Sequence, residues 1–511
     1  MRFVPPGVPP GTATVRNNEL TTKQFTHTLN FNKEIFTNLN LNAVAGFEYT
    51  EFQSKGFSAT GYGAQGTGFG NFGIDYTNYI QYSDPNGRSI SSFADPSSEL
   101  QSYFGRTIFN YGDKYLLTAT LRADGSSKFG ENNKYGYFPS FAAAWHISKE
   151  KFFKVDFINS LKMRSGWGKT GNQEFPAGSA QTRYSFSNGG IIGQVNNPNP
   201  DLKWQSDKQF NVGLDFSIFN NRVSGTIDYF NKTTTNLLFP SPPIQPAPLN
   251  SVVRWINLDG EIKNKGFEFL INASVISHQN FKFDVGVNAT FLKNNVSGLP
   301  SPVYTGFVGG PVQIIQNGYP MNTFYTRKFL ELDKTTGFSL YEGNGASFYY
   351  VGDPNPEILL GISPVILYKK ISLTANMYGA FGHDVFYQSL MNFLNVGGIS
   401  GGSNIALSVF RDPVKEAIAN PVTPSSRFIL KGNYLKIANL TLNYALGNVK
   451  NVFKEANIYI TGQNLFILTK YPGFDPETNA DASINGIPSL GIDNTQYPSS
   501  RTIIFGINFS L

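Results

Sequence analysis

Apolar and polar residues alternate strictly along much of this sequence, and no other feature limits its fold as severely. In the segment 210–218, FNVGLDFSI, every second side chain is apolar, and the residues between them are Asn, Gly, Asp and Ser. After Asn220 and Asn221 the alternation resumes over residues 223–229. A period of two predicts strands with one apolar face, and the short polar break predicts a hairpin turn.

The same pattern recurs in segments of about 9 to 12 residues, close to the length that a tilted strand needs to cross a bilayer. These segments include 39–49, 281–291, 371–381 and 503–511. The connections between the segments fall into two classes. Short links lie at 111–114, 220–221, 277–280 and 368–370, whereas long polar stretches rich in Gly and Pro lie at 171–204, 235–262, 294–322, 382–432 and 468–500.

Alternating short and long connections favour an outer-membrane barrel, which has short periplasmic turns and long extracellular loops. Soluble domains seldom contain so many long loops. Counting back from the C-terminus, each short link falls on the periplasmic side, and the chain begins on the extracellular side. A soluble β-solenoid or a set of stacked sandwiches is the alternative, but it needs a second inward-facing layer for which the sequence offers no segments.

Composition agrees with a wall that contacts lipid on one side and water on the other. Charged residues make up 15% of the chain and aromatic residues 15%, yet the mean hydropathy is only −0.22. No run approaches the roughly 18 to 20 apolar residues of a transmembrane helix. The chain has no Cys and a scattered net charge of +6, so we expect no disulfide framework and no nucleic-acid partner.

The cost of misplaced charge fixes which face meets lipid. A shift of one residue in the hairpin 210–229 would turn Asp215 and Asp228 toward hydrocarbon. A charge at the bilayer centre costs on the order of 2–4 kcal/mol for Lys or Arg and somewhat less for Asp. We therefore predict an all-β fold, a transmembrane antiparallel β-barrel, because unpaired strand edges are not tolerated in lipid.

Several motifs, in order along the chain, resemble the SusC/RagA-type TonB-dependent transporters of the outer membrane. The segment LRADGSSKFGENNKYGYFPSFAAAWHISKEKFF (121–153) is similar to the region of the family around R-x-D-G-S-S-x-F-G. The segment INSLKMRSGWGKTGNQEF (158–175) is similar to its LKLR…YG-x-T-GNQ region, and residues 199–239 follow its NPxLxWE…GLDF region, with Gln205 in place of Glu. Later matches lie at 263–271, 351–386, 433–446, 460–479 and 497–511.

The resemblance implies a particular domain organisation. Large transporters of this kind have about 22 strands around a plugged lumen, whereas the alternation indicates about 15 to 17 strands here. We expect residues 1–24 to be an extracellular-loop-like N-terminal segment. Residues 25–511 are then the C-terminal part of a TonB-dependent receptor β-barrel, incomplete relative to the family and without a plug domain or TonB box.

The resemblance also implies a function and partners. Members of the family import glycans or oligopeptides across the outer membrane, with a SusD-like surface lipoprotein over their extracellular loops. TonB would act on this chain only through a missing N-terminal plug and barrel portion. Outer-membrane lipid would contact the outer face of the wall. Two alternatives are a shortened passive pore and a barrel protein that binds surfaces without transport.

Aromatic residues in the loops are the candidate substrate contacts. Their rings can stack on a sugar face or pack against a peptide, although loop packing or an interfacial girdle is the simpler explanation. These candidates are Trp255, Tyr304, Phe348, Tyr349 and Tyr350.

No motif indicates an enzyme, and we expect no catalytic residue, no metal site and no cofactor. The four His residues are isolated, and no G-x-S-x-G motif is present. In DPETNADASING (475–486), Ala480 and Gly486 occupy the positions where an EF-hand loop needs Gly and Glu. The two G-x-G-x-x-G matches in 61–73 precede no helical pattern, so we expect a loop there.

Overall fold

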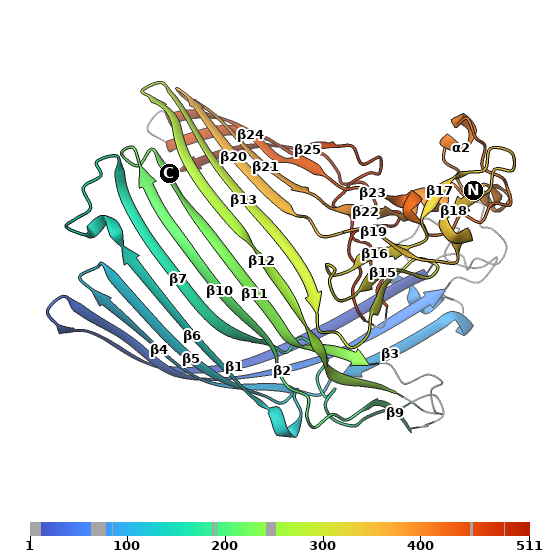
Figure 1. Ribbon diagram of the computed structural model, residues 1–511, viewed down its shortest axis with the longest axis horizontal. Coiled ribbons are helices and arrows are strands. Elements are labelled where there is room, and N and C mark those ends of the chain that lie inside the picture. Colours follow the sequence, from blue (N-terminus) through green and yellow to red (C-terminus); the bar gives the residue numbers. More distant parts are fainter. Residues whose placement is uncertain are drawn as a thin grey trace.

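A single curved antiparallel sheet dominates the computed structural model (Figure 1), which describes residues 12–62, 78–83, 85–186, 190, 192–241, 252–449, 453–484 and 486–510. Within these ranges the sheet contains 18 strands. Fifteen of them form the wall, each paired with the next: β1 (Thr12–Phe36), β2 (Leu39–Tyr62), β4 (Ser98–Tyr111), β5 (Tyr115–Ser126), β6 (Tyr135–His146), β7 (Ile158–Asn172), β10 (Gln205–Ile218), β11 (Val223–Ser241), β12 (Val253–His278), β13 (Phe281–Ser297), β20 (Ile358–Tyr368), β21 (Ile371–Phe381), β24 (Tyr434–Val449), β25 (Phe453–Thr469) and β27 (Thr502–Ser510).

The remaining strands and helices lie in the connections. The strands β3 (Arg88–Ala94), β8 (Arg183–Phe186) and β9 (Ile192–Asn197) extend the wall sheet. The other short elements are β14 (Val303–Phe307), β15 (Pro311–Ile315), β16 (Thr323–Thr326), β17 (Phe329–Leu332), β18 (Ser339–Tyr341), β19 (Tyr349–Gly352), β22 (Asp384–Tyr387), α1 (Gln388–Phe393), α2 (Ser408–Arg411), β23 (Ile429–Lys431) and β26 (Ile492–Asp493). None of the helices in the described ranges is long and apolar enough to cross a membrane.

The register confirms the apolar face predicted from the sequence. Val212 on β10 lies opposite Tyr229 on β11, and Leu214 lies opposite Ile227. Asp215 stands on the other face, where its carboxylate binds side chains of β7. The all-β antiparallel fold class is therefore confirmed, and the fifteen wall strands fall within the predicted number.

Short turns and long connections separate to opposite ends of the sheet (Figure 1). The turn between β10 and β11 contains Asn220 and Asn221 with φ angles of 55° and 62°, a left-handed conformation that Asn tolerates better than most residues. The turn between β20 and β21 is shorter still, with Lys369 at a φ of 53°. These turns occupy the links that the alternation predicts at 220–221 and 368–370.

The outer row of β1 shows where the hydrocarbon begins and ends. From Asn17 to Lys23 this row carries polar groups, and Lys23 pairs with Glu51 of β2 at 3.2 Å. From Phe25 to Phe31 the row is aromatic or aliphatic except for His27, and Lys33 follows. The band from Phe25 to Lys33 matches the roughly 9 to 11 residues of a membrane-crossing strand.

Two expectations for connecting segments are corrected by the strands. Residues 12–24, expected to be loop-like, belong to β1, and residues 1–11 lie outside the described ranges. The predicted loop 235–262 is largely strand, because β11 and β12 remain paired as far as Ser241 and Arg254. Hairpins continue past the bilayer because backbone pairing needs no lipid-facing apolar row. The glycine-rich stretch 61–73 is mostly outside the described ranges.

Both ends of the wall are open edges within the described part of the chain. β1 pairs along its length with β2, and β27 pairs with β25. No pairing joins β1 to β27 among the described residues. Each of these two edge strands therefore has one row of backbone N–H and C=O groups that must find a hydrogen-bond partner when the sheet lies in lipid.

The two faces of β13 provide a test of the architecture. Val287 belongs to the outer apolar row, whereas its neighbour Asn288 belongs to the inner row. We expect Val287→Arg to lower the free energy of unfolding by about 2–4 kcal/mol, because it places a charge in hydrocarbon. The matched variant Asn288→Arg should change it by less than about 0.5 kcal/mol. Urea titration of vesicle-inserted protein, followed by tryptophan fluorescence, measures both values, and equal losses would place both faces in the same medium.

Candidate functional site

Three long connections on one side of the wall fold together into a unit that we call the cap. They comprise residues 298–357, 382–433 and 470–501, and their elements gather at the same end of the sheet in Figure 1. A shared apolar core holds them together: Val308, Val312, Phe324, Phe386, Leu394, Val409, Phe428 and Ile492. The side chain of Gln313 adds two hydrogen bonds to the backbone of Leu490. Its amide nitrogen donates to the carbonyl oxygen of Leu490 at 2.6 Å, and its amide oxygen accepts from the backbone N–H of Leu490 at 3.2 Å.

A buried ion pair holds the middle connection of the cap in place. Both terminal guanidinium nitrogens of Arg427 donate to the carboxylate of Glu416, at 2.9 and 2.8 Å. The Glu416 side chain is only 2% exposed and also accepts a hydrogen bond from Asn420 at 2.6 Å. The guanidinium lies over the rings of Phe329 and Phe428. Because the pair is bidentate and fully satisfied, it fixes the connection against β17.

An aromatic cluster on the cap is the strongest candidate for ligand contact, and we call it the tyrosine platform. Tyr319 and Tyr350 stack with their centroids 3.8 Å apart and their planes 12° apart. Tyr325 lies 5.0 Å from Tyr350, 5.7 Å from Phe348 and 6.5 Å from Tyr304. Three of the predicted contact residues therefore meet around two tyrosines that the sequence analysis did not single out.

The tyrosine platform presents ring surface to solvent, and the hydroxyl at its centre, that of Tyr350, is hydrogen-bonded. Tyr304 is 48% exposed and Tyr350 is 37% exposed. The hydroxyl of Tyr350 donates to Oε1 of Gln316 at 2.5 Å. Burial among neighbouring rings raises the pKa of Tyr350, and the adjacent tyrosines Tyr319 and Tyr325 act in the same direction. The exposed tyrosine rings are therefore neutral and suit stacking against a neutral ring or an apolar side chain. A cation also borders the cluster, because the Arg327 guanidinium lies 5.2 Å from the ring centroid of Phe348.

The other two predicted contact residues lie elsewhere. Tyr349 precedes Tyr350 on β19, so its side chain points to the opposite face, where Lys328 lies 5.9 Å from the ring centroid. Trp255 packs 5.5 Å from Phe175. It borders a separate core built from Phe129, Phe138, Phe175, Ala180, Leu202 and Trp204. Each residue therefore has a packing role, and neither joins the tyrosine platform.

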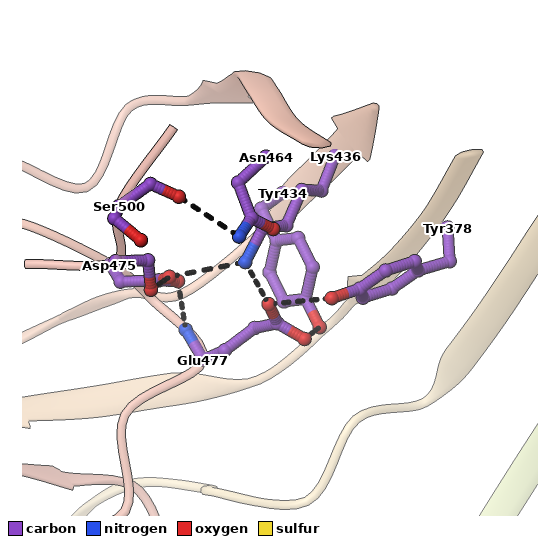
Figure 2. A network of polar contacts seen from close by, with 8 residues as sticks. Tyr378, Tyr434, Lys436, Asn464, Asp475, Glu477 and Ser500 are labelled. Atoms are coloured by element: carbon purple, nitrogen blue, oxygen red, sulfur yellow. Dashed lines mark hydrogen bonds and ion pairs between the residues drawn. The ribbon is translucent and has the colours of Figure 1, made fainter. Parts of the chain in front are cut away.

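The last connection, 470–501, is fastened to the wall by the polar network shown in Figure 2. Lys436 on β24 contacts Glu477 at 2.6 Å and Asp475 at 3.2 Å. Tyr378 on β21 and Tyr434 on β24 donate to the two oxygens of Glu477 at 2.9 and 3.1 Å. The Lys436 side chain is only 9% exposed, so this connection seals the inner surface at the cap end of β21 and β24.

The same connection is anchored to the cap core. The hydroxyl of Tyr471 donates to Asp493 at 2.6 Å, and Ser389 donates to the other carboxylate oxygen at 2.6 Å. Burial and the hydrogen bond with Asp493 raise the pKa of Tyr471. The hydroxyl therefore stays protonated and can donate. The connection 470–501 is thus fixed at both the wall and the cap.

Charged side chains on the inner face of the wall form pairs between neighbouring strands. Arg164 on β7 contacts Asp215 at 2.9 Å and Asp228 at 2.6 Å. Lys162 adds a contact of 3.4 Å to Asp215. A Cβ at Gly213 would overlap both the Asp228 carboxylate and the Arg164 guanidinium. Glycine at this position therefore leaves the space in which Arg164 bridges the two acids.

The acidic segment 475–486 does not form a convergent set of ligands. Asp475 and Glu477 bind Lys436, whereas Asp481 accepts from the backbone amide of Ser483 at 3.0 Å. No cluster of three or more His, Asp or Glu residues suited to a metal ion occurs among the residues that the structure describes. These carboxylates serve to hold the connection in shape.

Residues 5–386 match a protein-family model described as TonB dependent receptor-like, beta-barrel. The chain belongs to this family. Among curated proteins, it is 31% identical to the TonB-dependent receptor SusC of Bacteroides thetaiotaomicron, over 80% of this chain and 43% of that protein. It is 30% identical to the TonB-dependent receptor P3 of Formosa agariphila, over 98% of this chain and 53% of that protein.

Solved structures agree with the sequence relatives. The RagAB peptide transporter superposes with a TM-score of 0.81 over 97% of this chain and 56% of that one, at 23% identity, which shows a shared fold. The resemblance to SusC/RagA-type transporters and the outer-membrane location are therefore confirmed. The chain spans about half the length of the curated relatives that it matches.

The buried pair in the cap makes a prediction about its stability. Arg427→Met leaves Glu416 buried without its counter-charge, which costs about 3–5 kcal/mol in comparable pairs. We expect the connection 382–433 of this TonB-dependent receptor to become sensitive to added protease while the wall remains resistant.

The double variant Glu416→Gln with Arg427→Met also removes the unpaired negative charge of Glu416. We expect it to regain part of the resistance of residues 382–433 to protease. If Arg427→Met alone leaves the cleavage rate unchanged, the pair does not hold the cap together.

Proposed function

We propose that this chain forms the lipid-facing wall, the inner surface and the cap of an outer-membrane importer of glycans or oligopeptides. The observation that carries the proposal is the tyrosine platform. Exposed aromatic faces stand on a cap that has its own buried core, above a wall whose inner face is polar. A fixed aromatic surface can capture a solute with little loss of its own conformational entropy, because its rings are already ordered.

The partners follow from the resemblance to SusC. A SusD-like surface lipoprotein would close over the cap and present the solute to the tyrosine platform. TonB would act through an N-terminal plug and barrel portion rather than through the present residues. That portion would also supply strands between β27 and β1, whose free edges need partners in lipid.

The two alternatives receive less support. A passive pore made from these strands alone would need a direct pairing of β1 with β27, and none occurs among the described residues. A barrel that only binds surfaces would not use the polar inner face beneath the tyrosine platform as a path for a solute. Transport rather than catalysis is therefore the proposed activity, in line with relatives that are all named as receptors.

Neighbouring tyrosines on β19 provide a matched test. Tyr350→Ala removes a ring from the tyrosine platform, and an aromatic contact is worth about 0.5–1.5 kcal/mol. We expect cells that carry this variant at the native locus to bind and take up a fluorescent oligosaccharide about 2- to 10-fold less well.

Tyr349→Ala is the control, because its ring points to the opposite face of the strand. Equal losses in both variants would indicate a folding defect rather than a lost contact. Binding that survives with no uptake in the parent protein would favour the surface-binding alternative.

A further inference from the structure

The inner face of the wall divides into two halves of different chemistry. On strands β2 to β13, which we call the charged half, basic side chains meet acids across neighbouring strands. Arg122 contacts Glu48 at 3.5 Å and Asp124 at 2.6 Å. Lys232 contacts Asp207 at 2.8 Å, in addition to the pairs made by Arg164. These ionic groups recur from strand to strand along this half.

The inner face of β20, β21, β24, β25 and β27, which we call the neutral half, is built differently. From Lys436 at the cap end to Glu455 at the turn end, its described inward side chains carry no charge. Hydrogen bonds join the hydroxyls of Thr441 and Thr461 at 2.9 Å, and Ser363 to Asn376 at 3.1 Å. The surface consists of hydroxyl and amide groups with apolar residues between them, among them Val365, Leu367 and Ile504.

Wall chemistry of this kind affects what can move along it. Passage needs contacts strong enough to admit a solute and weak enough to release it, and rings of fixed charge set electrostatic barriers. Hydroxyl and amide groups exchange hydrogen bonds with a polar solute at small net cost, because each neutral bond contributes only about 0.5–1.5 kcal/mol. The neutral half therefore suits a neutral, hydroxyl-rich chain better than the charged half does.

The tyrosine platform is continuous with the neutral half. Tyr350 belongs to β19, and only residues 353–357 separate β19 from β20. Asn355 in this short link donates to the carbonyl of Met321 at 2.6 Å, next to the segment that carries Tyr319. On the next strand, the hydroxyl of Tyr378 lies on the inner face at the cap end of the neutral half. The aromatic groups of the cap thus meet the polar groups of the wall at this link, which also carries Asp353 and Glu357.

We propose that the neutral half is the translocation surface, and that it selects an uncharged, hydroxyl-rich oligosaccharide over a charged oligopeptide. The proposal rests on the importer function above and narrows it to one side of the wall and one class of solute. The charged half contributes ion pairs that stiffen the wall.

The absence of native Cys makes a site-by-site test direct. Single substitutions Asn376→Cys and Thr441→Cys report on the neutral half. Asn211→Cys and Thr118→Cys report on the inner face of the charged half. Each variant, produced at the native locus, is labelled in intact outer membranes with a water-soluble maleimide. The labelling rates are compared without solute, with a neutral gluco-oligosaccharide and with a lysine-rich peptide of similar length.

We expect the oligosaccharide to slow labelling several-fold at Asn376→Cys and Thr441→Cys and to leave the other two rates unchanged, with little effect of the peptide. Equal protection in both halves, protection only in the charged half, or protection by the peptide alone would overturn the inference. Uptake of the oligosaccharide without protection in the neutral half would reject this path and leave the importer function standing. No uptake and no protection at any position would reject both.

Discussion

Every backbone amide and carbonyl in the hydrocarbon layer must find a partner within the protein, because lipid offers none. This requirement explains why the wall strands of this TonB-dependent receptor pair one after another without interruption from β1 to β27. It also explains why apolar and polar side chains alternate so strictly. A paired strand has only two faces, and here one face contacts lipid and the other contacts water. The polar network at the cap end and the ion pairs of the inner face depend on this arrangement, because both need an inner surface from which lipid is excluded.

Much of the wall could be predicted from local pattern because its rules are local. A period of two fixes the face of each residue, so the opposition of Val212 and Tyr229 follows once the turn at 220–221 is placed. The length of the hairpins could not be predicted, because strands that rise past the bilayer lose the apolar row on which the pattern depends. Residues 231–235 are all polar and still pair with β12.

The candidate site was predictable only in part, for a different reason. Aromatic residues in polar loops stand out by composition, which identified Tyr304, Phe348 and Tyr350. Tyr319 and Tyr325 join them only because separate stretches of the cap fold onto one small sheet. No period or spacing encodes such contacts within a long connection. Likewise, nothing local distinguishes Tyr349, whose ring turns away, from its neighbour.

The first hairpin continues well beyond the lipid band marked by Phe25. Residues 12–24 remain paired with β2, and at about 3.3 Å per residue they run roughly 40 Å along the strand direction. Even with the tilt of a barrel strand, this portion carries the rim of the wall well beyond the hydrocarbon layer. Substitutions in these strand tips therefore need to preserve backbone pairing, but they need not preserve the apolar row that lipid requires farther down the same strands.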